Sequence, residues 1–305
     1  MPDETCEIPS DPAVPGDTAA ASGPPDGLVL VSTPIGNLQD LSPRAVAVLG
    51  AAHTLLCEDT RVTSRLCAVL GINPTLLALH DHNEDGRIPQ VLRLLGEGRR
   101  VALVSDAGTP LVSDPGYRLV RAALEAGLPV SAVPGPNAAL LALTLSGLPP
   151  HPFLFMGFLP PKGAARRVVL ARLRAAERAG LAATLLFHEA PHRLAEALTD
   201  MAELLGPRQA AVARELTKRF EEVVRGPLPE LAARYAAVPP RGEVTLVVGP
   251  PPAEAAPAEA DLDALLRAAL EGHSLKEAVA EVTAATGLPR RVVYARALVL
   301  GDHES

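Results

Sequence analysis

Short apolar runs that alternate with helical stretches are the feature that most constrains the fold of this chain. The first run, Leu28–Val31, ends at a Ser-Thr-Pro break, and Ser42-Pro43 then supplies a helix cap and a first helical residue. Further apolar runs, each separated from the next by a helical pattern, cover 53–57, 76–79, 101–105 and 130–133. Continuous apolar runs between helices are typical of parallel strands covered on both faces. The sequence therefore predicts an open α/β sheet whose ligands lie beyond the carboxyl ends of its strands.

Proline and composition divide the chain. Gly-Leu-Pro-Pro-His-Pro at 147–152 holds three prolines in four residues and forbids regular structure there. After it, strands are expected at 153–158, 184–187, 210–215 and 244–248, with helices between them. We expect a disordered acidic tail at 1–26, an N-terminal α/β domain at 27–147, a C-terminal α/β domain at 152–250 and a small helical domain at 261–300.

Charge is unevenly spread. The net charge is −7, but the acidic ends leave residues 27–249 with +3, and 160–180 carries six basic residues against one acid. A local basic segment can attract nucleic acid even when the total is negative, although a solvated helix face explains it equally well. The three cysteines lack Cys-x-x-Cys spacing, which argues against a zinc or other metal site and favours a reducing, cytoplasmic location. Neither a signal peptide nor an apolar run of about 18 residues is found.

Three loops follow expected strands of the first domain. They read "STPIGN" at 32–37, "SDAGTPLVSDPGY" at 105–117 and "PGPNAA" at 134–139. Each alone is a weak signal because Pro/Gly loops mostly turn the chain. Together, at one edge of one sheet, they predict a ligand cleft. None contains a G-x-G-x-x-G or G-x-x-x-x-G-K-[ST] motif, which lowers the expectation of a nucleoside triphosphate.

The motifs resemble a known family. "TPIGNLQDLSPRA" (33–45), "CEDTRVTSRL" (57–66), "HDHNE" (80–84), "VSDAGTPLVSDPGY" (104–117), "PGPNAA", "GFLPPK" (157–162) and "ARELTK" (213–218) are similar to the ribosomal RNA small subunit methyltransferase I family, a branch of the tetrapyrrole methylase superfamily. The resemblance implies a two-domain tetrapyrrole-methylase-like (class III) methyltransferase fold with a small C-terminal helical domain. It also implies S-adenosylmethionine-dependent 2′-O-methylation of a cytidine ribose in the decoding region of 16S rRNA.

The same resemblance indicates where the cofactor S-adenosyl-L-methionine lies. The implied cofactor-binding residues are Pro34, Asp106, Ala107, Gly108, Thr109, Pro110, Pro134, Gly135, Phe187 and His188. Two positions depart from the family pattern: Asn137 stands where Ser or Cys is commoner, and His188-Glu189-Ala190 stands where Tyr-Glu-Ser is common. The first loop also lacks the Gly-Asp-Pro of enzymes that act on tetrapyrroles.

Transfer of a methyl group to a ribose hydroxyl needs a general base or a well-placed cation, because the hydroxyl is a weak acid. Candidate catalytic residues are Glu189, Glu215, Lys218 and Asp59. Asp59 could equally fix a helix start by pairing with Arg61, and Lys218 could simply contact phosphate. Candidate phosphate-binding residues are Arg61, Arg65, Lys162, Arg166, Arg167 and Arg219, with Lys218 as a further one.

The sequence also leads to expectations about partners and leaves two alternative functions open. We expect 16S rRNA as partner, within the assembled 30S subunit because one nucleotide must be read in its shape context, and a homodimer. The C-terminal helices could dock RNA, pack a dimer or cap the fold. One rival is a methyltransferase acting on a tetrapyrrole precursor, which predicts Gly-Asp-Pro in the first loop. The other is a non-catalytic rRNA-binding assembly protein, which would tolerate decay of the "SDAGTP" loop.

Overall fold

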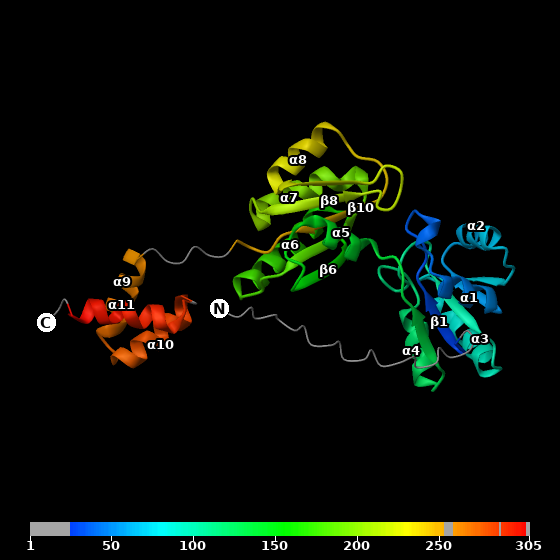
Figure 1. Cartoon of the computed structure of the whole chain (residues 1–305), viewed down its shortest axis with the longest axis horizontal. Coiled ribbons are helices and arrows are strands. Elements are labelled where there is room, and N and C mark those ends of the chain that lie inside the picture. The colour runs from blue at the N-terminus through cyan, green and yellow to red at the C-terminus, as the bar shows by residue number, and fades with distance from the viewer. Residues whose placement is uncertain (1–24, 253–258, 287, 303–305) are drawn as a thin grey trace, which may run out of the picture. The chain divides into compact units, whose positions relative to one another are not determined.

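The computed structural model describes residues 25–252, 259–286 and 288–302 and divides the chain into two compact units, Met1–Pro250 and Pro251–Ser305. Figure 1 shows the elements in chain order. The expected disordered tail lies outside the described residues, apart from its last two positions. Within the described ranges, no helix is both long and apolar enough to traverse a bilayer.

A fully parallel sheet forms the first part of the larger unit. Its strands are β1 (Leu28–Val31), β2 (Thr54–Cys57), β3 (Thr75–Ala78), β4 (Val101–Val104) and β5 (Val130–Val133). Their order is β3-β2-β4-β1-β5, and every pair is parallel. The strands β4, β1 and β5 are therefore neighbours, and the three loops of interest leave the same edge.

Helices cover both faces of this sheet. They are α1 (Pro43–Ala51), α2 (Thr60–Leu70), α3 (Glu84–Gly96) and α4 (Tyr117–Glu125). Val29 and Val31 face one way and pack with α1 and α2, whereas Leu28 faces the other way and packs with α3 and α4. Alternation along a strand explains this division, and burial on both faces explains the unbroken apolar runs. The predicted α/β class is confirmed.

The second sheet is mixed. It contains β6 (Phe153–Phe158), β7 (Thr184–Glu189), β8 (Gln209–Arg214), β9 (Glu222–Pro227) and β10 (Val244–Val248). The order is β6-β7-β10-β8-β9, with β6 and β7 parallel and the other pairs antiparallel. The strand β9 is not among the expected strands, because its residues EVVRGP begin with an acid and end in Gly-Pro. As an edge strand it needs only one partner, and it tolerates that composition.

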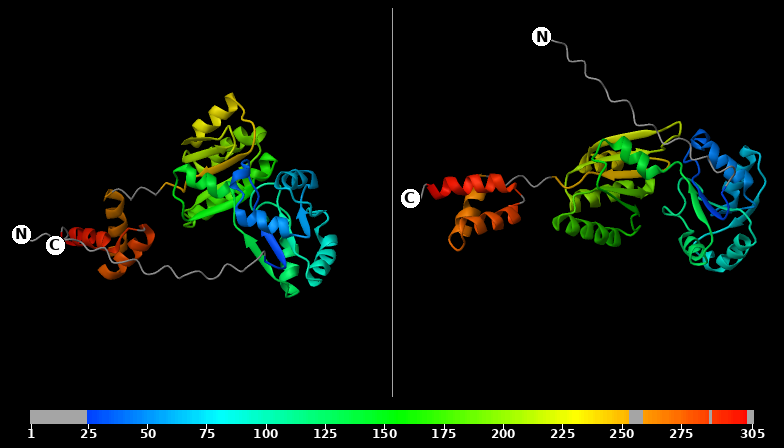
Figure 2. Two further views of the ribbon diagram at one scale, coloured as in Figure 1. Left: turned by 45° about the vertical axis from the view of Figure 1, so that its right-hand side comes forward. Right: turned by 60° about the horizontal axis from the view of Figure 1, so that its bottom comes forward.

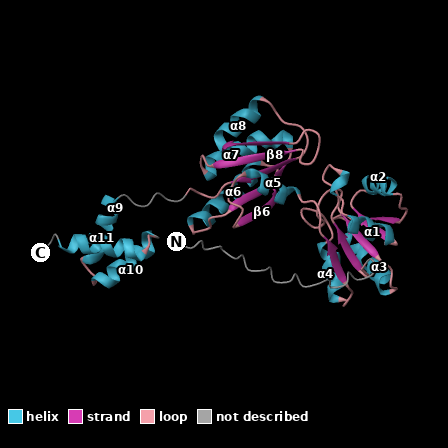
Figure 3. Cartoon of the chain, in the orientation of Figure 1, coloured by secondary structure: helices cyan, strands magenta, loops and turns pink. Residues whose placement is uncertain are grey.

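Helices also cover both faces of the second sheet, as Figures 2 and 3 show. On one face lie α6 (Gly163–Arg178), α7 (Leu194–Leu205) and α8 (Leu228–Ala237), around the fully buried Phe187. On the other lies α5 (Ala138–Ser146), together with Ile35 from the first loop. The helix α5 thus precedes the Pro-rich segment 147–152 in sequence yet packs on the sheet that follows it. This arrangement ties the loops of the first sheet to the second.

The smaller unit contains three helices in its described residues, α9 (Glu259–Leu270), α10 (Leu275–Thr286) and α11 (Arg290–Asp302). Leu266, Val279 and Val293 are buried between them. Arg296 of α11 pairs with Asp263 of α9, with 2.6 Å between Nε and Oδ1. The three helices therefore have a core of their own.

Candidate functional site

The three loops are joined by hydrogen bonds at the carboxyl edge of the first sheet. The N–H of Thr33 donates to the carbonyl of Gly108 at 2.9 Å, and the N–H of Gly108 donates back at 3.0 Å. The Thr109 hydroxyl donates to the carbonyl of Pro136 at 3.1 Å and accepts from the amide of Asn137 at 3.2 Å. One threonine therefore connects the second loop to the third, and Asn137 provides one of the bonds.

We expect Thr109→Val to loosen this junction, because valine keeps the shape but removes the hydroxyl. The partly buried carbonyl of Pro136 and amide of Asn137 would lose their partner, which costs about 1–3 kcal/mol of the free energy of unfolding. Urea unfolding measures the loss. The matched control is Thr144→Val on α5, where an exposed hydroxyl bonds only a carbonyl within its own helix. Equal, small losses in both variants would contradict the junction's role.

A cavity of about 380 Å³ lies between the two sheets. Its lining residues are Ile35, Asp106, Ala107, Val112, Ser113, Asp114, Ala138, Phe158, His188, Glu189, Ala190, Pro191, Gly242, Glu243, Val244 and Thr245. Four of these carry carboxyl groups, and none is Lys or Arg. The stretch 242–245, at the start of β10, lines the cavity but is not among the expected site residues. No motif marks it, and only the pairing of β10 with β7 brings it beside His188.

The Asp114 carboxyl is the most perturbed acid of this cavity. Burial, reinforced by the charges of Glu58, Asp106 and Asp81, raises its pKa to about 6. Burial also raises the pKa of Glu58, again with Asp106 as a contributing charge. Carboxyls with raised pKa values in a cleft are typical of functional sites, because burying an ionisable group lowers the stability of the fold.

Glu189 and His188 form the opposite wall, at the end of β7. Glu189 is 2% exposed, and its Oε1 atom accepts from the N–H of Ala190 at 2.8 Å and pairs with Arg193 at 2.6 Å. The Oε2 atom is buried and has no partner in the described structure. The His188 ring lies 5.1 Å from the Phe155 ring, and burial lowers its pKa, so this histidine is neutral near pH 7.

Glu215 and Lys218 lie together on the segment between β8 and β9. Lys218 Nζ is 2.9 Å from Glu215 Oε1 and 3.1 Å from Glu243 Oε2. The pKa of Glu215 is lowered, chiefly by the N–H of Glu243 and then by Lys218. The methylenes of Lys218 lie against Gly36 of the first loop, where a Cβ would overlap them. This contact explains the single glycine of "STPIGN", which leaves room for a lysine from the other sheet.

Asp59 occupies the cap position of α2. Its Oδ1 atom accepts from the N–H of Arg61 at 2.8 Å, and its Oδ2 atom lies 2.6 Å from Arg61 Nη2. These bonds lower its pKa to about 2, which makes it a weak base. The helix-start pair considered for Asp59 and Arg61 is the arrangement observed, and Asp59 does not line the cavity.

The candidate RNA contacts differ in their availability. Arg65, Lys162 and Arg219 are exposed, and no ion pair joins any of them to the described residues. Arg61 is exposed but paired with Asp59. Arg166 is 3% exposed and pairs with Asp200 at 2.6 Å, so it is a buried structural residue and not an RNA contact. Its neighbour Arg167 pairs at 2.6 Å with both Asp200 and Glu203.

The residues that the resemblance assigns to the cofactor are likewise divided. Asp106, Ala107 and His188 line the cavity between the sheets, and Gly108 and Thr109 belong to the junction of the loops. Pro110 is buried, Pro134 is exposed, and Gly135 lines a different cavity. Pro34 lines a cavity beside α2, described below. The side chain of Phe187 is in the core of the second sheet, so it can offer only backbone atoms.

Family models match most of the chain. A model described as Tetrapyrrole (Corrin/Porphyrin) Methylases matches residues 27–232, and one described as RsmI C-terminal HTH domain matches 256–301.

Solved structures with the same fold include that of the methyltransferase CobJ, at 24% identity and a TM-score of 0.54 over 75% of this chain and 95% of that one. Diphthine synthase is similar at 15% identity, with a TM-score of 0.55 over 73% of this chain and 89% of that one. At these identities the similarity shows the fold.

Curated relatives are much closer. The chain is 50% identical to "Ribosomal RNA small subunit methyltransferase I" of Micromonospora olivasterospora, covering 88% of this chain and 85% of the relative. It is 48% identical to the protein of that name from Mesorhizobium japonicum, covering 90% and 92%. The Escherichia coli O157:H7 relative is 44% identical, covering 89% and 94%. The chain belongs to the ribosomal RNA small subunit methyltransferase I family, within the tetrapyrrole methylases.

Proposed function

We propose that this protein is an S-adenosylmethionine-dependent rRNA methyltransferase. The cavity between the sheets carries the proposal, because its described lining residues include four carboxyls and no Lys or Arg. Arg193 and Lys218 pair with Glu189 and Glu243 from outside the lining, whereas Asp106 and Asp114 have no ion pair among the described residues. Such a wall disfavours a phosphate-rich nucleotide and favours a ligand with positive charge. A sulfonium cofactor with an amino group has that charge.

The residues of the cavity fit this cofactor by their chemistry. The Oε2 atom of Glu189 is a buried acceptor without a partner among the described residues, and burying such an atom is costly unless a ligand satisfies it. Asp106 and Ala107 from the second loop, and His188 to Ala190 with Val244 and Thr245 from the second sheet, would hold the cofactor. When bound, S-adenosylmethionine supplies an activated methyl group.

Within this function we propose the finer reaction, 2′-O-methylation of a cytidine in the decoding region of 16S rRNA. The motif resemblance supports it, and the names of the curated relatives support its coarser part, methylation of small-subunit rRNA. The first loop supports it against a tetrapyrrole substrate, because Gly36 there accommodates Lys218 and the Gly-Asp-Pro sequence is missing. The intact "SDAGTP" loop, whose members Asp106 and Ala107 line the cavity, argues against a non-catalytic assembly protein.

We further propose that Asp114 accepts the proton of the ribose hydroxyl. A base works best when its pKa is near the working pH, and Asp114, with a pKa of about 6, is better matched than Asp59 at about 2. Glu215 is weakened as a base by Lys218 and the N–H of Glu243. Glu189 is fixed by Arg193 and is assigned to the cofactor side instead. Lys218 lies beside the first loop, where its charge would contact phosphate or polarise the reacting oxygen.

The partners follow from the same reaction. We propose the assembled 30S subunit as substrate, in the cytoplasm, with Arg65, Lys162 and Arg219 contacting phosphates. We also propose a homodimer. Leu140 of α5 lines a cavity of about 540 Å³ and is 48% exposed. Phe220, three residues after Thr217 of the same lining, is 66% exposed. These side chains offer apolar surface to a second copy of the chain.

Calorimetry with S-adenosylhomocysteine tests the cofactor assignment directly. We expect one site per chain and no binding of ATP, because the acidic wall repels triphosphate. Glu189→Gln should weaken binding, since the amide that replaces the carboxyl group has one acceptor oxygen instead of two. Absence of S-adenosylhomocysteine binding to the wild-type chain would contradict the proposed function.

A further inference from the structure

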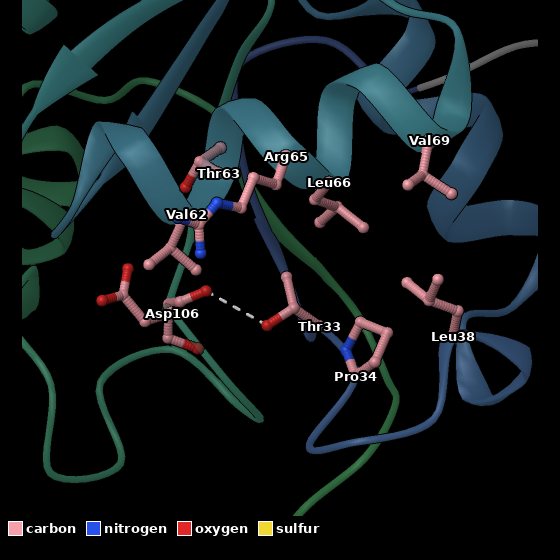
Figure 4. Close-up of a pocket in the computed structure, with 10 residues that line it drawn as sticks. Thr33, Pro34, Leu38, Val62, Thr63, Arg65, Leu66, Val69 and Asp106 are labelled. Atoms are coloured by element: carbon pink, nitrogen blue, oxygen red, sulfur yellow. Dashed lines mark hydrogen bonds between the residues drawn. The ribbon is translucent and has the colours of Figure 1, made fainter.

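A second cavity, of about 250 Å³, lies beside α2 at the carboxyl ends of β1 and β4 (Figure 4). Its lining residues are Thr33, Pro34, Leu38, Val62, Thr63, Arg65, Leu66, Val69, Ser105 and Asp106. It is smaller than the roughly 300–1,000 Å³ of ordinary small-molecule sites, a size that suits one planar ring system and not a whole cofactor. Asp106 lines both this cavity and the one between the sheets.

The walls of this cavity are apolar and open to solvent. Figure 4 shows Leu66 and Val69 of α2 on one side, with Pro34 of the first loop and Leu38, which follows that loop, on the other. Leu38 is 52% exposed and Val69 is 64% exposed, although both are large apolar side chains. An apolar slot of this kind is suited to the two faces of a nucleobase taken out of its stack.

The polar end of the cavity offers few free groups. Thr33 Oγ1 donates to the carbonyl of Ser105 at 3.1 Å, and Ser105 Oγ donates to the carbonyl of Gly108 at 3.0 Å. Asp106 Oδ1 accepts from the N–H of Asp59 at 3.1 Å, and no bond to its Oδ2 atom is found among the described residues. Arg65 supplies N–H donors at the same end. The cavity therefore combines one carboxylate acceptor with one guanidinium donor.

We propose that this cavity binds the base of the target nucleotide and selects cytosine, with Asp106 accepting from its exocyclic amino group. This inference rests on the proposed function. A carboxylate accepts from the amino group of cytosine, whereas uracil presents a carbonyl oxygen at that position and would be repelled. Arg65 faces the ring's acceptor atoms or the adjacent phosphate. Asp106 lines both cavities, so a base in the cavity beside α2 would place its ribose toward the cavity between the sheets.

Base selection is tested with 30S subunits assembled from 16S rRNA carrying cytidine or uridine at the methylated position. We expect wild-type protein to prefer cytidine by roughly 5- to 150-fold in kcat/KM, the usual range for one specific base contact. In Asp106→Asn the amide oxygen still accepts from Asp59, and its NH₂ group can donate to the uracil carbonyl. The preference should therefore shift toward uridine. The readout is the ratio of kcat/KM for the two RNAs with the same variant, so a general loss of cofactor affinity affects both values equally and cancels.

A second variant blocks the cavity without touching its polar end. We expect Val69→Trp to lower kcat at least tenfold while the dissociation constants for S-adenosylhomocysteine and for the 30S subunit change little. The matched control is Leu124→Trp, on an exposed face of α4, which should behave as wild type. Without any methyl donor, pyrrolocytosine at the target position should brighten as it unstacks with wild-type protein and not with Val69→Trp.

Two results would overturn the inference. One is an unchanged preference for cytidine in an Asp106→Asn variant that still methylates. The other is normal kcat and normal brightening with Val69→Trp. Either result leaves the proposed function intact, whereas failure of the wild-type protein to methylate any 30S subunit would refute that function itself.

Discussion

Asp114→Asn is expected to lower kcat by about 10²- to 10⁴-fold, the usual contribution of a positioned base. The amide keeps the size of the side chain but cannot accept the proton of the ribose hydroxyl. Binding of S-adenosylhomocysteine should change little, because Asp114 is assigned to the ribose hydroxyl and the residues assigned to the cofactor stay unchanged. In the wild type, kcat/KM should rise through pH 6 and level off above it, following ionisation of a group whose pKa is about 6.

Asp114→Asn should raise thermal stability at neutral pH although it lowers kcat. Because the folded state raises the pKa of Asp114 from 3.8 to about 6, it binds this proton more tightly than the unfolded chain does. The stabilising contribution of the protonated form is therefore present below pH 3.8 and is lost as pH rises toward 6. Above that window the wild type carries a partly buried charge that asparagine lacks. We expect Asp114→Asn to raise Tm at pH 7 and to leave it unchanged near pH 3.5.

The control for Asp114 is Asp85→Asn, a carboxylate of α3 whose side chain is 74% exposed and pairs with Arg118. Its kcat should equal that of the wild type. A loss of kcat in Asp114→Asn that is accompanied by a lower Tm would point to a damaged fold and contradict the role of Asp114 as a base. So would a pH profile that keeps its inflection near pH 6 in the variant.

Arg208→Ala is expected to destabilise the larger unit by about 3–5 kcal/mol. It leaves the buried carboxylate of Glu177 with only the 3.5 Å contact of Arg174 as a cationic partner. Arg208 and Glu177 of α6 have side chains 3% and 1% exposed, and two N–H groups of Arg208 donate to Glu177 at 2.6 and 3.0 Å. The remaining donors bond the carbonyls of Leu205 and Gly249. The pair therefore ties α6, the end of α7 and the end of β10 together.

Urea unfolding at neutral pH measures this cost. The matched control is Arg121→Ala, which breaks an exposed pair with Glu125 on α4 and should change stability little. Replacing both partners, Arg208→Met with Glu177→Leu, should recover most of the loss, since no charge then remains buried. The account would be contradicted if Arg208→Ala cost no more than Arg121→Ala.

Much of the first sheet could be predicted from sequence because its signals are local. Leu28–Val31 is an uninterrupted apolar strand, and Ser42 caps α1 with a 3.1 Å bond to the N–H of Ala45, as its place before Pro43 suggested. The prediction that three loops leave one edge followed from the parallel strands and is confirmed by the bonds between Thr33 and Gly108 and between Thr109 and Pro136.

The features that escaped prediction depend on contacts between distant segments. The edge strand β9 exists because β8 pairs with it, and its own residues carry little strand signal. Arg166 looked like part of a basic surface, but Asp200, 34 residues later on α7, draws it into the interior. The raised pKa of Asp114 comes chiefly from its burial and then from the charges of Glu58, Asp106 and Asp81, two of which lie on loops that follow other strands. Sequence spacing does not encode these neighbours.

The most direct test of the central claim is transfer of labelled methyl from S-adenosylmethionine to 30S subunits that lack their native methylation. The labelled 16S rRNA is then digested, and its nucleosides are separated. The account predicts that the label appears in 2′-O-methylcytidine from the decoding region. Label in a methylated base or in a tetrapyrrole precursor, or no label in RNA at all, would contradict it.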